Sequence, residues 1–105
     1  MIIKENLETI EVSDIGEDVS WSEGLHISFI QWVPGGADDV IQIQNGDSVD
    51  DPVCYYNWAS GPNVDLPRYF YGALVRVFID YSMCSLSAGH KLIIQTMPKG
   101  GSFIR

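Results

Sequence analysis

Two histidines are the residues in this chain best suited to general acid–base chemistry near neutral pH. His26 lies within an alternating apolar and polar segment, and His90 lies at a turn before another such segment. Neither has a nucleophile or carboxylate at a spacing that predicts a catalytic pair. Hydrolase, zinc-protease and phosphate-loop motifs are absent from the sequence. We therefore interpret both histidines as structural and predict a protein that is not an enzyme.

Carboxylates concentrate in one segment that follows the turn dipeptide Asn45-Gly46. Asp47, Asp50 and Asp51 supply hard oxygen atoms of the kind that Ca²⁺ prefers. Their spacing does not match the calcium-binding loop of an EF-hand. We interpret them as solvated loop charges and predict no metal and no cofactor, with a calcium site at these three residues as the alternative.

Aromatic residues form two clusters on either side of a segment rich in glycine, proline and asparagine. Tyrosine and tryptophan rings next to asparagine side chains are typical of sugar-binding platforms, because the rings stack and the amides bind hydroxyl groups. Aromatic residues also fill the interior of small β domains, which is the alternative interpretation. The residues of the predicted ligand site are Tyr55, Tyr56, Asn57, Trp58 and Asn63, and the second cluster is Tyr69, Phe70 and Tyr71.

Alternation with a period of two predicts the strands that carry these residues. Ala73–Tyr81 has apolar residues at every odd position, and Leu25–Val33 alternates in the same way. Asp38–Gln44, Val53–Asn57 and Lys91–Met97 are shorter segments of this kind. Pro34-Gly35-Gly36 predicts a turn, so Leu25–Val33 and Asp38–Gln44 are expected to pair as an antiparallel hairpin.

About seven short strands with turn signals every 8–12 residues predict an all-β fold. We expect residues 1–105 to form a single-domain antiparallel β-sandwich with a jelly-roll-like or Greek-key topology, and a small β-barrel is the alternative. A chain of 105 residues with 46% apolar residues is large enough to bury a hydrophobic core.

Two of the predicted strands carry large apolar residues on the face opposite the expected core. These residues are Ile30 and Trp32 on the first strand, and Leu74 and Phe78 on the second. A monomer seldom exposes a large contiguous apolar patch, so either loops or another chain must cover them. A symmetric homo-oligomer is the commonest solution of the second kind.

The charge balance excludes several classes of partner. Fourteen acidic and six basic residues give a net charge of −8, which opposes binding to nucleic acid and to anionic membranes. The first residues do not form a secretion signal, so we expect a cytoplasmic or virion location. Cys54 and Cys84 lie in no metal-binding motif. We expect them to be reduced, although a disulfide between them is the alternative.

Three segments resemble small β-sandwich structural proteins of tailed phages and prophages: DDVIQIQNGD at 38–47, YGALVRVFID at 71–80 and SLSAGHKLIIQTM at 85–97. The resemblance implies a non-enzymatic structural or interaction protein that acts as an oligomer, such as a virion component. Its partners would be further copies or other structural proteins. A carbohydrate-binding module that uses the aromatic platform is the alternative function.

Overall fold

Seven strands and one short helical turn make up the fold of the computed structural model, which describes residues 1–6, 8–61 and 67–97. The three-residue 3₁₀ helix η1 joins the last two strands. The elements are β1 (Ile2–Asn6), β2 (Thr9–Ser13), β3 (Val19–Val33), β4 (Val40–Asn45), β5 (Val53–Trp58), β6 (Arg68–Ile79), η1 (Tyr81–Met83) and β7 (Lys91–Thr96). The protein is therefore all-β with seven antiparallel strands, as the sequence predicts.

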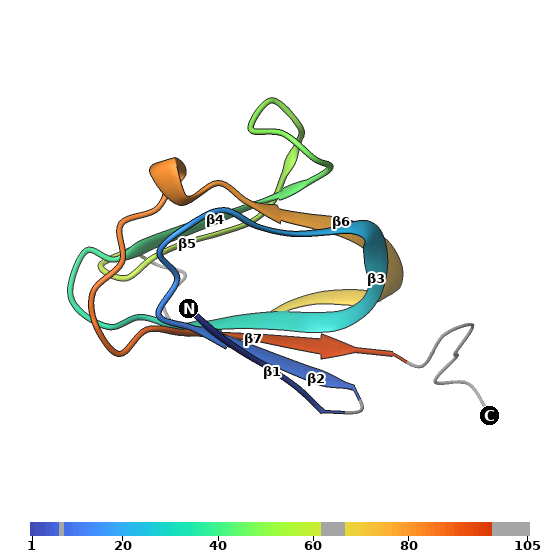
Figure 1. Cartoon of the computed structure of the whole chain (residues 1–105), viewed down its shortest axis with the longest axis horizontal. Helices are drawn as coiled ribbons and strands as arrows, with labels where there is room; N and C mark the ends of the chain where they lie inside the picture. The colour runs from blue at the N-terminus through green and yellow to red at the C-terminus, as the bar shows by residue number, and fades with distance from the viewer. Residues whose placement is uncertain (7, 62–66, 98–105) are drawn as a thin grey trace.

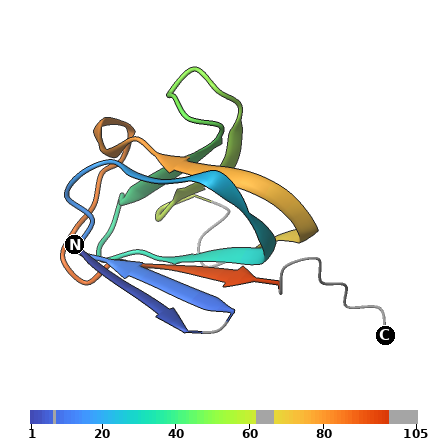
Figure 2. The ribbon, with the colours of Figure 1, turned by 45° about the vertical axis from the view of Figure 1, so that its right-hand side comes forward.

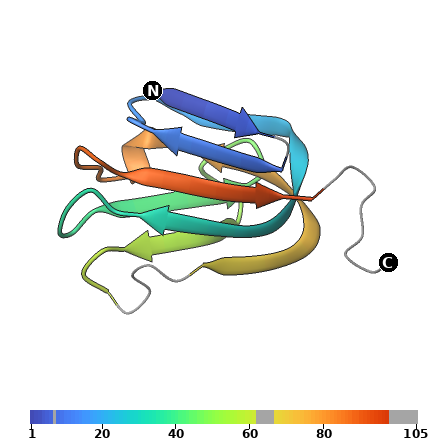
Figure 3. The ribbon, with the colours of Figure 1, turned by 90° about the horizontal axis from the view of Figure 1, so that it is seen from below.

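The strands form one antiparallel sheet in the order β1-β2-β7-β3-β6-β4-β5, with β1 and β5 at its two edges. Figures 1 and 2 show β3 and β6 turning together at one end of the molecule, so that the sheet bends back over itself. Viewed from below in Figure 3, β1, β2, β7 and the second half of β3 lie side by side. The sheet is not closed, because no strand joins β5 to β1 in the described part of the chain.

Register shifts in the long β3–β6 pair coincide with this bend. The pairing slips between Trp21 and Leu25 and again between Ile27 and Phe29. Gly24 and Gly72 adopt positive φ angles of 88° and 86° at these shifts, a conformation that glycine tolerates best. Bulges of this kind bend and twist a strand pair, which explains how one sheet encloses its own core.

Side chains from both halves of the bent sheet fill the interior. Alternation along β6 is as predicted from Leu74 to Ile79, since Val75, Val77 and Ile79 are buried while Leu74 and Arg76 are exposed. The predicted burial of Ala73 is wrong, because this residue is exposed. The predicted end of this strand is wrong, because Tyr81 lies exposed in η1. Fully buried residues from the other strands are Val12, Ile27, Ile30, Trp32, Ile41, Ile43, Leu92 and Ile94.

The predicted hairpin around Pro34-Gly35-Gly36 is wrong. The end of β3 that leads into this turn, residues 31–33, pairs with β7, and the preceding part of β3 pairs with β6. β4 pairs instead with β5 and with the end of β6. The turn at Gly35 and Gly36 therefore connects strands that are not neighbours in the sheet.

Candidate functional site

The predicted interface at Ile30 and Trp32 is wrong, because both side chains are fully buried inside this chain. A register shift lies between Ile27 and Phe29 in β3. Before this shift the odd-numbered residue Ile27 points inward, and after it the even-numbered residues Ile30 and Trp32 point inward. Leu74 remains 55% exposed and Phe78 is partly buried. The chain itself covers half of the residues that were expected to meet a partner.

A groove of ≈ 540 Å³ lies where the sheet is open, between β5 and the start of β6. We call it the tyrosine groove. It brings together the two aromatic clusters that the sequence separates by a loop. Its walls consist of Val53, Cys54, Tyr55, Tyr56 and Asn57 from β5, with Pro67, Arg68, Tyr69 and Tyr71 opposite.

Tyr71 is the most exposed large apolar residue of the described chain, with 86% of its surface accessible. Its φ angle is +54°, a left-handed conformation that is unfavourable for a bulky residue. The ring lies beside that of Tyr69, with centroids 6.2 Å apart, and Tyr69 in turn lies 5.9 Å from Phe29. An exposed tyrosine on a strained backbone contributes little to the core, which indicates a functional role.

The predicted ligand residues divide between the interior and the groove. Tyr55 and Asn57 are buried, and the Asn57 amide donates a hydrogen bond to the Tyr55 hydroxyl at 3.3 Å. Tyr56 is half exposed, and Trp58 is exposed but lies outside the groove lining, with its Nε1 donating to Asp38 at 3.3 Å. Asn63 lies outside the described residues. The structure therefore places Tyr56 in one groove lining with Tyr69 and Tyr71, whereas Trp58 lies outside this lining.

The outer side of β5 has no neighbouring strand among the described residues. The Ala59 N–H donates to the Asp39 carbonyl at 2.8 Å, which sets the alternation of backbone groups along β5. Backbone groups on a strand point alternately to its two sides, so Tyr55 and Asn57, like Ala59, direct their N–H groups toward β4. The N–H and carbonyl of Tyr56 therefore point away from β4, toward the groove. Tyr56 therefore presents both an aromatic ring and a pair of backbone hydrogen-bonding groups at this edge.

Arg68 supplies the charge of the groove, because its described lining contains this cation and no carboxylate. The guanidinium lies 5.1 Å from the centroid of the Phe70 ring, a cation–π contact that orients it. Burial raises the pKa of the neighbouring Cys54 thiol to about 11 despite the attraction of Arg68. Both Cys54 and Cys84 are free thiols, and Cys54 is protonated at neutral pH.

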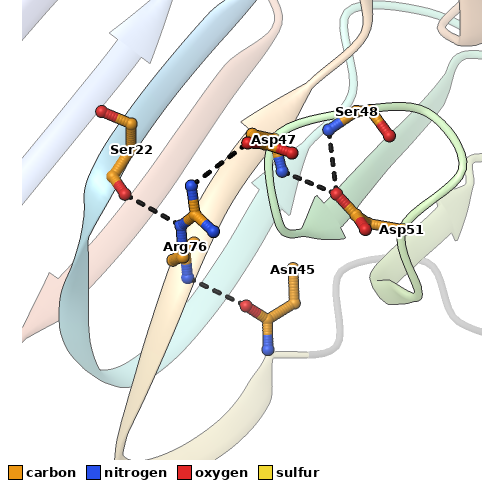
Figure 4. Close-up of polar contacts among 6 residues, drawn as sticks. All are labelled: Ser22, Asn45, Asp47, Ser48, Asp51 and Arg76. Atoms are coloured by element: carbon orange, nitrogen blue, oxygen red, sulfur yellow. Dashed lines mark hydrogen bonds and ion pairs between the residues drawn. The ribbon is translucent and has the colours of Figure 1, made fainter.

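The Asp51 carboxylate of the acidic loop is hydrogen-bonded to the backbone of the same loop (Figure 4). The Asp51 carboxylate accepts hydrogen bonds from the N–H groups of Asp47 and Ser48 at 2.7 and 3.0 Å, which lower its pKa. Asp47 forms an ion pair with Arg76 at 3.3 Å, and Arg76 also donates to the Ser22 carbonyl. Nowhere in residues 1–6, 8–61 and 67–97 do three metal-binding side chains converge. The calcium alternative at Asp47, Asp50 and Asp51 gains no support.

The two histidines have different structural roles. His90 is buried, its Nε2 accepts a hydrogen bond from the Ile15 N–H at 2.8 Å, and its Nδ1 donates to the Ser87 carbonyl at 2.8 Å. Its ring stacks on Trp32 with centroids 5.5 Å apart. His26 is exposed and its Nδ1 lies 3.1 Å from the Gly72 carbonyl. Neither histidine belongs to the described lining of the tyrosine groove.

Comparison of the chain with protein-family models, with curated proteins and with solved structures gives no match. The resemblance to phage structural proteins therefore stays a prediction. Within the described residues, no helix has the length and apolar character needed to cross a membrane.

Two features of the groove were not predicted. Arg68 was not among the predicted site residues, although it directly precedes the Tyr69–Tyr71 cluster. It also did not mark β5 as an edge strand. One signal was present in the sequence, because Val53–Trp58 has no charge while the loop before it is acidic.

Proposed function

We propose that this protein is a non-enzymatic interaction domain that assembles into an oligomer through the tyrosine groove. The observation that carries this proposal is Tyr71, which is 86% exposed at a positive φ angle beside Tyr69. The groove thus replaces the interface that was expected at Ile30 and Trp32.

The composition of the groove supports a protein partner. Tyrosine and arginine are enriched at protein interfaces, and acidic residues are depleted there. Among the described residues, the groove lining contains four tyrosines and one arginine and no acidic residue, although the chain carries fourteen. Val53, Tyr56 and Tyr69 are each about half exposed, so their burial against a partner would remove apolar surface from water.

The sequence resemblance implies that this assembly forms part of the virion of a tailed phage. Structural proteins of this kind are built from repeated copies, and repeated copies require an interface on each one. The net charge of −8 would keep the rest of the assembled surface soluble.

Light scattering on a sizing column tests the proposal at several protein concentrations. We expect a discrete oligomer that Tyr71→Asn dissociates, because asparagine tolerates the backbone conformation but lacks the ring. Tyr81→Asn is the matched control, since Tyr81 is also exposed but lies in η1 outside the groove lining. A monomer at every concentration would contradict the proposal.

Glycan binding is the second candidate, and the Tyr69–Tyr71 pair favours it. The rings lie 6.2 Å apart at an angle of 32°, and Tyr71 is exposed enough to stack on a sugar ring. A calorimetric titration with a panel of neutral and acidic oligosaccharides tests this function. Saturable binding that Tyr71→Asn abolishes in a monomeric protein would favour it over assembly.

A further inference from the structure

We infer that a second copy of this chain is the partner, and that the β5 strands of the two copies pair antiparallel around a two-fold axis at Tyr56. This inference rests on the proposed function. It adds that the groove is occupied by a second copy of the chain and that Tyr56 lies at the centre of the contact. The pairing would join the two seven-stranded sheets edge to edge.

The two edge strands of the sheet differ in their protection against such pairing. Edge strands that stay unpaired usually carry charges or proline, which hinder the approach of another strand. β1 carries Lys4 and Glu5, whereas β5 has the sequence VCYYNW with no charge, proline or glycine. Valine, tyrosine and tryptophan also favour strands. An edge of this composition is suited to be covered by another strand.

The direction in which the backbone N–H and carbonyl groups of β5 point places Tyr56 at the centre of the pairing. Its N–H and carbonyl face away from β4, as the Ala59–Asp39 hydrogen bond shows. In an antiparallel pair a residue on the two-fold axis exchanges both hydrogen bonds with its own copy. The register then sets Cys54 opposite Trp58 of the second copy. The Trp58 N–H also faces outward, while its carbonyl already accepts from Gly61 at 2.8 Å.

The first residues of β6 provide the second part of the contact. Arg68–Ala73 pair with β3 on one side and with no described strand on the other, so the sheet has two free edges next to each other. When the β5 strands pair, Tyr69 and Tyr71 of the two copies face one another across the same seam. The second copy would then cover the Tyr71 ring, which explains why this side chain is exposed on a backbone with positive φ in the single chain.

Charge repulsion between the two copies is also smaller at this edge. Two copies of a chain with a net charge of −8 repel each other over most of their surface. The described part of the groove lining has one guanidinium and no carboxylate, so approach along β5 brings no carboxylates of the two described linings together.

Cysteine cross-linking tests the two-fold axis directly. Tyr56→Cys in a Cys54→Ser, Cys84→Ser background places two thiols on residues whose Cα atoms lie about 5.5 Å apart in a hydrogen-bonded pair, within disulfide range. We expect a covalent dimer under mild oxidation at low protein concentration. Lys4→Cys on the opposite edge strand, in the same background, is the matched control and should stay monomeric on a denaturing gel.

Two substitutions of Tyr56 distinguish the contribution of its backbone N–H to dimer affinity from that of its ring. Proline at this position removes the outward N–H and leaves the ladder to β4 intact, since edge strands tolerate it. Tyr56→Pro should raise the dimer dissociation constant roughly tenfold or more beyond Tyr56→Thr, which removes the ring but keeps the N–H. Circular dichroism verifies that both variants keep the fold.

The outcomes distinguish this inference from the proposed function. A covalent dimer of the Tyr56→Cys variant together with the proline effect supports both. A stable oligomer of the unmodified chain, combined with no cross-link in Tyr56→Cys and no response to Tyr56→Pro, overturns the β5 pairing and leaves the proposed function standing. A protein that is monomeric at every concentration overturns both.

Discussion

The carboxylate of Asp39 binds Ser87, which lies 48 residues further along the chain, through both of its oxygen atoms. Oδ2 accepts from the Ser87 N–H at 3.0 Å, and Oδ1 accepts from the Ser87 hydroxyl at 2.6 Å. Oδ2 also accepts from the N–H groups of Gly35 and Gly36 at 2.9 and 3.2 Å. One buried carboxylate therefore joins the turn after β3 to the loop before β7.

Replacement of this carboxylate should destabilise the fold. Asp39→Asn exchanges one acceptor oxygen for an NH₂ donor, which leaves part-buried donors of Gly35, Gly36 or Ser87 without an acceptor. We expect a loss of about 2–3 kcal/mol in the free energy of unfolding, measured by urea denaturation. Asp38→Asn is the matched control, because Asp38 is exposed and asparagine tolerates its φ angle of +66°. An equal loss in both variants would contradict the structural role of Asp39.

The same carboxylate predicts how stability depends on pH. Burial alone would raise the pKa of Asp39, but the hydrogen bonds from Ser87, Gly35 and Gly36 together lower it below the ordinary value of 3.8. A depressed carboxyl pKa stabilises the fold above the unfolded-state pKa, and this contribution disappears as the pH falls through the lower folded-state pKa.

Urea midpoints measured between pH 7 and pH 2 test this dependence. The stability difference between the unmodified chain and Asp39→Asn should be constant above about pH 5 and should shrink below pH 4. A difference that stays constant down to pH 2 would show that the charge of Asp39 is not the stabilising feature.

Gly35 allows the close approach of the two segments that Asp39 joins. A Cβ atom at this position would lie 2.4 Å from the carbonyl oxygens of Ser87 and Ala88. Since these neighbours are backbone atoms, Gly35→Ala should cost about 2 kcal/mol or more of stability. Gly16→Ala is the matched control, because no atom lies within 4 Å of its Cβ position. Thermal melts of both variants should show a lower midpoint only for Gly35→Ala.

His90 should be essential for stability although no catalytic role is assigned to it. His90→Phe keeps an aromatic ring against Trp32 but removes the acceptor for the Ile15 N–H and the donor to Ser87. We expect a loss of about 2–4 kcal/mol, because a buried backbone N–H is left unpaired. His26→Phe, at an exposed position, should cost less than about 1 kcal/mol. Equal losses would show that the ring itself, not its nitrogen atoms, stabilises the fold.

Local patterning was sufficient to predict most of the strands. Val75, Val77 and Ile79 of β6 and Leu92 and Ile94 of β7 are buried as their alternation predicts, whereas Ala73, expected on the same face of β6, is exposed. Ile41 and Ile43 on β4 also point inward as expected, but Gln44 is fully buried against the alternation. The pairing of β4 with β5 shifts between Ile43 and Gln44, which turns this side chain inward. Such shifts depend on the partner strand, so one segment of sequence does not reveal them.

The candidate site was only partly predictable for a related reason. The sequence marked two aromatic clusters, and the fold placed Tyr56, Tyr69 and Tyr71 around one groove. It also placed Tyr55 and Asn57 in the interior, because adjacent residues on a strand face opposite sides.

The amino-acid sequence by itself determined that this protein is an acidic, all-β chain, because alternation, turn residues and charge are local properties that can be counted. Tertiary structure alone decided which strands are neighbours, since β3 pairs with β6 and β7 instead of with β4. It also decided that Ile30 and Trp32 belong to the core, because a bulge in β3 changes the face on which each following residue lies. The open edge at β5, and with it the tyrosine groove, exists only once the whole sheet is assembled.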